Sequence, residues 1–314
     1  MIGVSLETAD QLLQRIIDSI PQWRDATYIE AEYISGGITN RNYRVCIDYT
    51  PFFVRLAGDQ TEALGIDRHN ELMAAKTAAE AGIGPKVVAF LPEHGCLITE
   101  WIDGSSVPPK RLKEPEMLSR LVHSIKTFHS CRQIPGAFSP FRIVELYRES
   151  AQRRGVEVPE VYWWLLERAR EIEKVFEQNP MPPHPCHNDL LNANFLLCRD
   201  RIMIVDYEYA GMGDVFFDLG NLSVNNDFDK DTDLALLEAY FGAATPSRIA
   251  RLKLMRLMSD FREAMWGVMQ QALSTLDFDY EDYATKHFAR CYQHARDEHY
   301  SIWLSEASSG NVER

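Results

Sequence analysis

Segments with strand-like and helix-like hydrophobic spacing are segregated along this chain, and no other feature limits its fold as much. Near the start, residues 28–34 and 52–56 are strand-like, and Tyr43, Val45 and Ile47 alternate with polar residues. A Ser-Gly-Gly break at 35–37 separates the segment 28–34 from the alternating segment that contains Tyr43. Alternation with a period of two indicates a half-buried strand, and Gly-rich breaks between such runs predict hairpins. We therefore expect a small antiparallel sheet here.

Helical spacing dominates the rest of the chain. Helices are expected at 7–20, 67–81 and 159–178, and Gly82 suits the position just after the end of the second. A strand pair is expected at 87–90 and 96–101. Beyond it the pattern is helical, apart from a short strand pair on either side of an Arg-Asp turn at 199–200.

This division predicts an α+β fold of two lobes. A small antiparallel-sheet N-terminal lobe would cover residues 1–101, and a larger, mainly helical C-terminal lobe would cover residues 102–314. We expect a hinge between them near residues 100–104.

Composition narrows the class of protein. The 314 residues carry a formal net charge of −13, which argues against a nucleic-acid partner and suits a cationic substrate, although many ordinary soluble proteins are as acidic. The six cysteines form no CxxC pair, so we expect reduced thiols. No secretory leader pattern and no apolar run of roughly 18–20 residues is present, which favours a cytoplasmic protein without a membrane partner.

The strongest chemical signal combines two carboxylates and an amide. Asp189 precedes Asn194 by five positions, and an apolar strand then ends at Asp206. Phosphoryl transfer requires a carboxylate that orients the attacking hydroxyl and accepts its proton, together with oxygen ligands for Mg²⁺. Each residue alone is more often a turn, a cap or a solvated strand end. In this order and spacing they favour a phosphotransferase.

A nucleotide-binding region is expected in the first lobe. The backbone around Gly36, Gly37, Thr39 and Asn40 lies between two strands, where its N–H groups would suit phosphates. A plain Gly-Gly hairpin is the alternative. Arg55 sits within a strand and Glu71 in the helix that follows, a pairing by which kinase-like lobes hold phosphates, unless it is a surface ion pair. The chain has neither a Walker A loop nor a kinase GxGxxG motif.

Several strings between about residues 30 and 300 resemble, in the right order, the choline/ethanolamine kinase family, and within it the bacterial LicA-like branch. They lie at 34–43, 54–55, 69–71, 84–86, 187–194, 206–210, 217–221, 266–267, 277–278 and 280–283. This resemblance implies the bilobal protein-kinase-like fold that the family shares with aminoglycoside phosphotransferases. It also implies ATP as co-substrate, Mg²⁺ as cofactor and a small alcohol as acceptor.

The resemblance implies a role for each matching residue. Asp189 would be the catalytic base. Asn194 and Asp206 would bind Mg²⁺, with Glu208 helping at a second metal. Arg55 would stand where protein kinases carry a lysine, and the backbone from Glu100 to Ile102 would hold the adenine. His187 and Asp218 would support the catalytic loop.

The acceptor pocket is expected on the C-terminal helices. Aromatic faces suit a quaternary ammonium such as choline, and Trp266, Phe278 and Tyr283 match the family's positions, although helical aromatics are more often plain core. Asn225 is also expected to line this pocket, although Asn225 and Met269 depart from the residues usual in choline kinases. Choline, ethanolamine, thiamine-like cations and other amino alcohols therefore stay open as acceptors.

The predicted function is thus an ATP- and Mg²⁺-dependent small-molecule kinase, with choline or ethanolamine as the first candidates. An aminoglycoside phosphotransferase is one alternative, disfavoured by the Trp-Gly pair at 266–267. A non-catalytic pseudokinase is another, disfavoured by the presence of Asp189, Asn194 and Asp206 together. A protein kinase is disfavoured by the missing His-Arg-Asp, Asp-Phe-Gly and Ala-Pro-Glu strings. Whether the chain forms a homodimer stays open.

Overall fold

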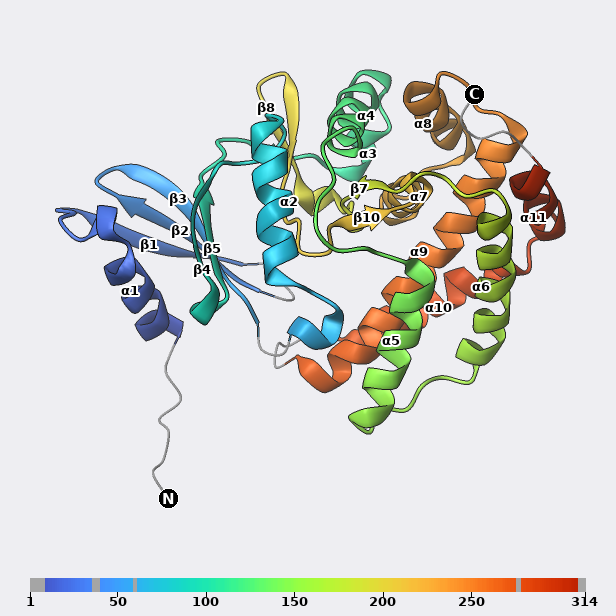
Figure 1. The fold of residues 1–314 in the computed structure, drawn as a ribbon, viewed down its shortest axis with the longest axis horizontal. Helices are drawn as coiled ribbons and strands as arrows, with labels where there is room; N and C mark the ends of the chain where they lie inside the picture. Colours follow the sequence, from blue (N-terminus) through green and yellow to red (C-terminus); the bar gives the residue numbers. More distant parts are fainter. Residues whose placement is uncertain (1–8, 36–39, 59–60, 275–277, 310–314) are drawn as a thin grey trace. The chain divides into compact units, whose positions relative to one another are not determined.

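The structure is a computed structural model that describes residues 9–35, 40–58, 61–274 and 278–309 (Figure 1). Its backbone contacts divide the chain into two compact units. The sheet unit comprises Met1–Gly58 and Lys86–Trp101, and the helical unit comprises Asp59–Pro85 and Ile102–Arg314. The predicted α+β class is confirmed. The functional division expected at residue 101 stays a prediction.

The sheet unit is a five-stranded antiparallel sheet with one helix against it. Its strands follow the order β1-β2-β3-β5-β4. The elements are α1 (Ala9–Ser19), β1 (Ile29–Ile34), β2 (Arg41–Ile47), β3 (Thr50–Leu56), β4 (Val87–Leu91) and β5 (Cys96–Glu100). The apolar side of α1, including Ile16 and Ile17, packs with Val45, Val54 and Ile98 of the sheet. Burial of these side chains stabilises the unit by the hydrophobic effect, at about 25 cal/mol per Å² of apolar surface.

The helical unit contains most of the chain. Its helices are α2 (Arg68–Glu80), α3 (Pro109–Leu112), α4 (Pro115–His129), α5 (Pro140–Arg153), α6 (Val161–Gln178), α7 (Val215–Asn225), α8 (Lys230–Phe241), α9 (Pro246–Leu273), α10 (Tyr280–Ala295) and α11 (Tyr300–Ser309). Two small antiparallel sheets lie among them, β6-β8-β9 and β10-β7. Their strands are β6 (Ser105–Ser106), β7 (His184–Cys186), β8 (Phe195–Cys198), β9 (Arg201–Ile204) and β10 (Gly211–Gly213).

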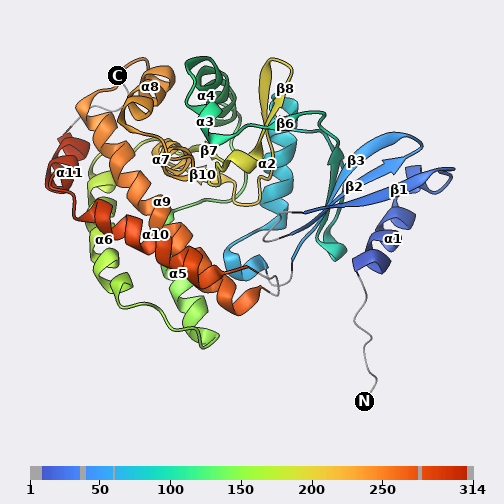
Figure 2. The ribbon, with the colours of Figure 1, turned by 180° about the vertical axis from the view of Figure 1, so that it is seen from behind.

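The long helix α9 is the centre of the helical unit. It packs against α5, α7, α10 and α11, and Figure 2 shows α10 lying along it. The contact with α7 is close because Gly220 has no side chain. A Cβ there would lie 2.7 Å from the carbonyl carbon of Met255. This approach fixes α7 against α9, so side chains from both helices reach the loop that follows β7.

Among the described residues, no helix is both long and apolar enough to span a bilayer. All six cysteines are unbridged, as expected for reduced thiols.

Candidate active site

The loop between β7 and β8 is held by side chains of α7. Asp218 accepts hydrogen bonds from the backbone N–H groups of His187 (2.8 Å) and Asn188 (2.6 Å). The Asn221 Oδ1 accepts from the Leu190 N–H at 2.5 Å. Buried backbone groups need such partners wherever regular secondary structure is interrupted. The loop that carries Asp189 is therefore fixed by α7.

His187 supports the same loop from within. Burial lowers the pKa of His187, so the ring is neutral. Its Nδ1 accepts from the Asp189 N–H at 3.2 Å, and its Nε2 donates to the Val205 carbonyl at 3.0 Å. These contacts give His187 the architectural role expected from the sequence.

The Asp189 carboxylate lies in a strongly charged environment. Its Oδ1 accepts from Arg262 Nη1 at 3.1 Å. Burial raises the pKa of Asp189 to about 7, because the charged form loses hydration, and Arg262 opposes that rise. The negative charges of Glu263, Asp206 and Glu208 add to it. The raised pKa of Asp189 is thus due first to its burial, and the neighbouring carboxylates add to it.

The three residues expected to bind metal adjoin Asp189. Asn194 donates through Nδ2 to the Asp189 carbonyl at 2.9 Å, and its own carbonyl accepts from Val205 at 3.0 Å. Asp206 is the next residue after Val205 and has a left-handed φ of 66°, which Asp tolerates better than most residues. Glu208 is buried and pairs with Arg68 at 3.3 Å. These links join Asp189, Asn194 and Asp206 in one region.

The donor set of this region fits Mg²⁺. Its groups are carboxylate and amide oxygens, the hard ligands that Mg²⁺ prefers. Because the Asn194 amide nitrogen is used in the bond to Asp189, its Oδ1 is the atom left for a cation. Glu208 already shares one oxygen with Arg68, so it is the weaker candidate.

The aromatic residues expected to contact the acceptor form one cluster. Trp266 of α9 lies 5.5 Å from Tyr283 and 5.9 Å from Tyr280 of α10, measured between ring centroids. Phe278, which is partly exposed, lies 5.9 Å from Tyr283. Trp266 also donates through Nε1 to the Tyr209 hydroxyl at 3.1 Å. Trp266, Phe278 and Tyr283 are therefore neighbours, whatever they bind.

Asn225 is not part of this cluster. It ends α7, and among the described residues it makes no hydrogen bond or ring contact with Trp266, Phe278 or Tyr283. Its role in acceptor binding stays a prediction.

Two charged residues of the site were missed by the sequence analysis. Arg262 and Glu263 are adjacent on α9 and only 1% and 2% exposed. Arg262 Nη1 also donates to Glu263 Oε1 at 2.5 Å, and Glu263 Oε2 accepts from the Tyr283 hydroxyl at 2.8 Å. An Arg-Glu pair inside the largely apolar stretch 257–269 was the available signal, because unpaired charges are rarely buried.

The structure describes only some of the residues expected to bind the nucleotide. Gly36, Gly37 and Thr39 lie outside the described residues. In the sheet unit, Asn40 accepts from the Gly58 N–H at 3.4 Å.

Arg55 is buried in β3, opposite Leu97 of β5. Glu100 ends β5 and lies 3.7 Å from Lys86 across the surface of the sheet unit. In the helical unit, Glu71 pairs with Arg68 at 2.8 Å and Ile102 is half-buried. The expected pairing of Arg55 with Glu71 would join the two units and stays a prediction.

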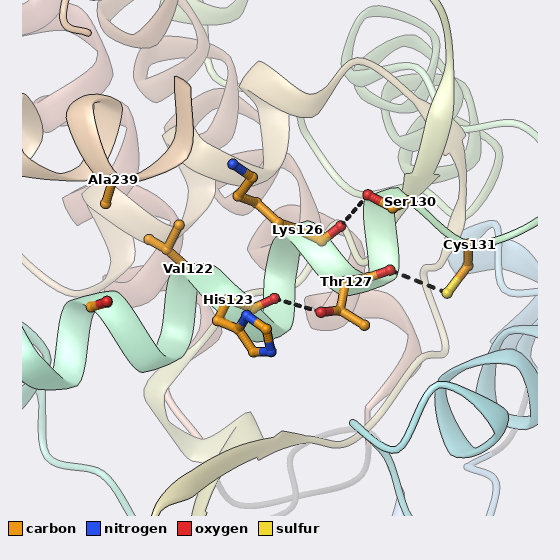
Figure 3. A pocket seen from close by; sticks show the side chains of 8 residues that line it. Val122, His123, Lys126, Thr127, Ser130, Cys131 and Ala239 are labelled. Carbon is orange, nitrogen blue, oxygen red and sulfur yellow. Dashed lines mark hydrogen bonds between the residues drawn. The ribbon is translucent and has the colours of Figure 1, made fainter. Parts of the chain in front are cut away.

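A hollow of about 670 Å³ elsewhere in the helical unit contains none of the expected site residues. It is lined mainly by α4, and Figure 3 shows its side chains. The Thr127 and Ser130 hydroxyls donate to carbonyls of their own helix, as does the Cys131 thiol. These three polar groups are therefore already bonded within the end of α4.

A buried group of His129, Cys186 and Asp218 has ligand atoms close enough for a metal ion, but two of them already have partners. His129 bonds through Nε2 to Asp218 at 2.9 Å and through Nδ1 to the Tyr240 hydroxyl at 2.7 Å. Through Asp218, this group supports the loop that carries Asp189.

Comparisons with known proteins show the family and the fold. The model of the choline/ethanolamine kinase family matches residues 31–235. A solved choline/ethanolamine kinase family protein from Mesorhizobium loti is 30% identical, with a TM-score of 0.81 over 95% of this chain and 100% of that one. Human ethanolamine kinase 2 is 26% identical over 91% of this chain and 82% of its own length.

The choline kinase LicA from Streptococcus pneumoniae is 23% identical with a TM-score of 0.77, over 91% of this chain and 98% of that one, which shows the fold alone. Aminoglycoside phosphotransferases share the fold at still lower identity. The expected protein-kinase-like fold is confirmed.

Proposed function

The chain belongs to the choline/ethanolamine kinase family and is a small-molecule kinase, and from this premise we propose that it transfers the γ-phosphoryl group of ATP, with Mg²⁺, to a small cationic alcohol. Choline and ethanolamine are the first candidates. The observation that best supports this proposal is the fixed loop that presents Asp189 beside Asn194 and Asp206.

In this proposal Asp189 is the base. One of its oxygens is held by Arg262, and the other would accept the proton of the attacking hydroxyl. Phosphoryl transfer needs little covalent catalysis from the protein. The protein would therefore act mainly by fixing this carboxylate and excluding water.

Asn194, Asp206 and Glu208 would hold Mg²⁺, which supplies positive charge to the transferred phosphoryl oxygens. Arg55, Glu71 and the backbone near Gly36, Gly37, Thr39 and Asn40 would bind the phosphates. The backbone from Glu100 to Ile102 would bind the adenine.

The acceptor would bind against the cluster around Trp266. Aromatic faces attract ammonium groups, and the Glu263 carboxylate supplies nearby negative charge. Phe278 and Tyr283 would contribute ring faces, and Asn225 is a further candidate on α7. We expect the enzyme to act in the cytoplasm.

The test is an assay of ADP release with Mg²⁺ and ATP across choline, ethanolamine, thiamine and kanamycin. We expect turnover concentrated on choline or ethanolamine and lost when EDTA removes the metal. Turnover on kanamycin alone would replace the proposed acceptor class. If Mg²⁺-ATP binds but none of the four is phosphorylated, choline and ethanolamine are excluded; if it does not bind, the kinase proposal fails.

A further inference from the structure

A chain of buried charged and polar groups links Asp189 to the aromatic cluster of the acceptor side. It runs from the Asp189 carboxylate to Arg262, from Arg262 to Glu263, and from Glu263 to the Tyr283 hydroxyl. All four residues belong to the helical unit. We propose that Arg262 is a positioning residue for Asp189, held in place by Glu263 and Tyr283; this inference rests on the proposed function.

Stability does not account for this arrangement. Removing an arginine and two carboxylates from water costs several kcal/mol per ion, and buried ion pairs are often no more stable than apolar residues of similar size. The compensation here is also incomplete. Among the described residues, the buried Nε and Nη2 atoms of Arg262 have no hydrogen-bond partner. An arrangement with this cost points to a function.

The geometry shows what Arg262 does to Asp189. Its Nη1 holds Oδ1 at 3.1 Å, and the described residues provide no hydrogen bond to Oδ2. One carboxylate oxygen is therefore fixed and the other is left for the acceptor hydroxyl. A carboxylate without such a contact would rotate, and a misplacement of ~1 Å at a reacting group can cost ~10²-fold in rate.

The guanidinium itself is restrained on two sides. Its central carbon lies 4.3 Å from the centroid of the Tyr209 ring, a cation–π contact that fixes the guanidinium over that face. The hydroxyl of the same tyrosine accepts from Trp266. Tyr209 therefore contacts both Arg262 and the predicted acceptor residue Trp266.

The test replaces Arg262 in the full chain and separates kcat from binding. In Arg262→Ala we expect kcat to fall by ~10²-fold, with the acceptor KM and the affinity for Mg²⁺-ATP little changed. Arg262→Lys should recover part of kcat, since it keeps the charge and one donor. Millimolar guanidinium should raise kcat of Arg262→Ala several-fold and have no such effect on Asp189→Asn.

Arg251 provides the matched control. It lies on the same helix, is 0% exposed, stacks on Phe176 at 3.9 Å and pairs with Asp214 at 3.1 Å. Arg251→Ala should lower Tm without a selective loss of kcat and without rescue by guanidinium.

The possible results distinguish failure of the positioning role of Arg262 from failure of the proposed kinase function. Arg262 would be a structural residue if folded Arg262→Ala kept wild-type kcat. The same would follow if its kcat were no lower than that of Arg251→Ala at a comparable loss of Tm and were not raised by guanidinium. In either case the kinase proposal would stand. Absence of wild-type ADP release with every acceptor, and with water as acceptor, would overturn the proposed function and this inference with it.

Discussion

At the scale of single residues, the proposed chemistry depends most on Asp189, the proposed base. Its carboxylate must stay close to other negative groups and still take up a proton during transfer. Burial raises the pKa of Asp189 towards the range where a base works best, while Arg262 keeps the carboxylate oriented and charged.

Replacing this carboxylate by an amide tests its role. Asn cannot accept the hydroxyl proton, so we expect Asp189→Asn to lower kcat by ~10²–10⁴-fold. Nucleotide binding, measured by calorimetry, should be nearly unchanged. Asp200→Asn, at the exposed turn between β8 and β9, is the control and should behave as wild type. Normal turnover in Asp189→Asn would exclude Asp189 as the base.

Asp206 is predicted to act through the metal instead. In Asp206→Ala we expect Mg²⁺ to lose its enhancement of ATP affinity, because the principal carboxylate ligand is gone. Titration calorimetry with and without Mg²⁺ measures the difference. Glu208→Gln should have the smaller effect, since Glu208 is already paired with Arg68. An unchanged Mg²⁺ dependence in Asp206→Ala would place the metal elsewhere.

At the scale of elements, the close contact of α9 with α10 determines where Tyr283 lies in the predicted acceptor site. A Cβ on Gly267 would lie 3.0 Å from the Ala284 Cβ, 3.1 Å from the Ala284 nitrogen and 3.1 Å from Tyr283 Cδ1. The glycine therefore allows Tyr283 to reach Glu263.

We expect Gly267→Ala to destabilise the protein by ~1–3 kcal/mol, since overpacking pushes α10 away. The acceptor KM should rise more than the KM for ATP, because Tyr283 moves with α10. Adding Ala284→Gly removes the Ala284 Cβ, one of the clashing atoms. The double variant should therefore lose less unfolding free energy than the two single variants lose together. Strictly additive losses, measured by urea unfolding, would contradict a direct contact.

The elements themselves could largely be predicted from the sequence. The expected helix at 67–81 is α2 (Arg68–Glu80), and Gly82 has the left-handed φ of 74° expected after a helix end. These signals are local, so they can be seen without the fold. The bond between Arg262 and Asp189 joins residues 73 positions apart, and no periodicity reports such a contact. The motif identified Asp189, but only the packing of α7 and α9 shows how it is held.

At the scale of the whole molecule, buried charge makes stability depend on pH. The helical unit buries Arg251, Arg262 and Asp260, each beside an opposite charge. Histidines add to this dependence. Burial lowers the pKa of His294 on α10, and the positive charges of Arg256, Lys253 and Arg290 lower it further, against the opposing effect of Asp260.

The sign of the His294 contribution follows from linkage. The unfolded histidine titrates near pH 6.5 and the folded one below it, so the unfolded chain binds more protons as the pH falls through this range. The stability contribution is full above about pH 6.5 and is lost as the pH falls towards the folded pKa. We therefore expect Tm to fall between about pH 7.5 and about pH 5.5, and to fall less in His294→Gln. His123→Gln, on the exposed side of α4, should follow the wild type. Equal slopes for His294→Gln and wild type would mean that His294 takes up its proton equally well in the folded chain.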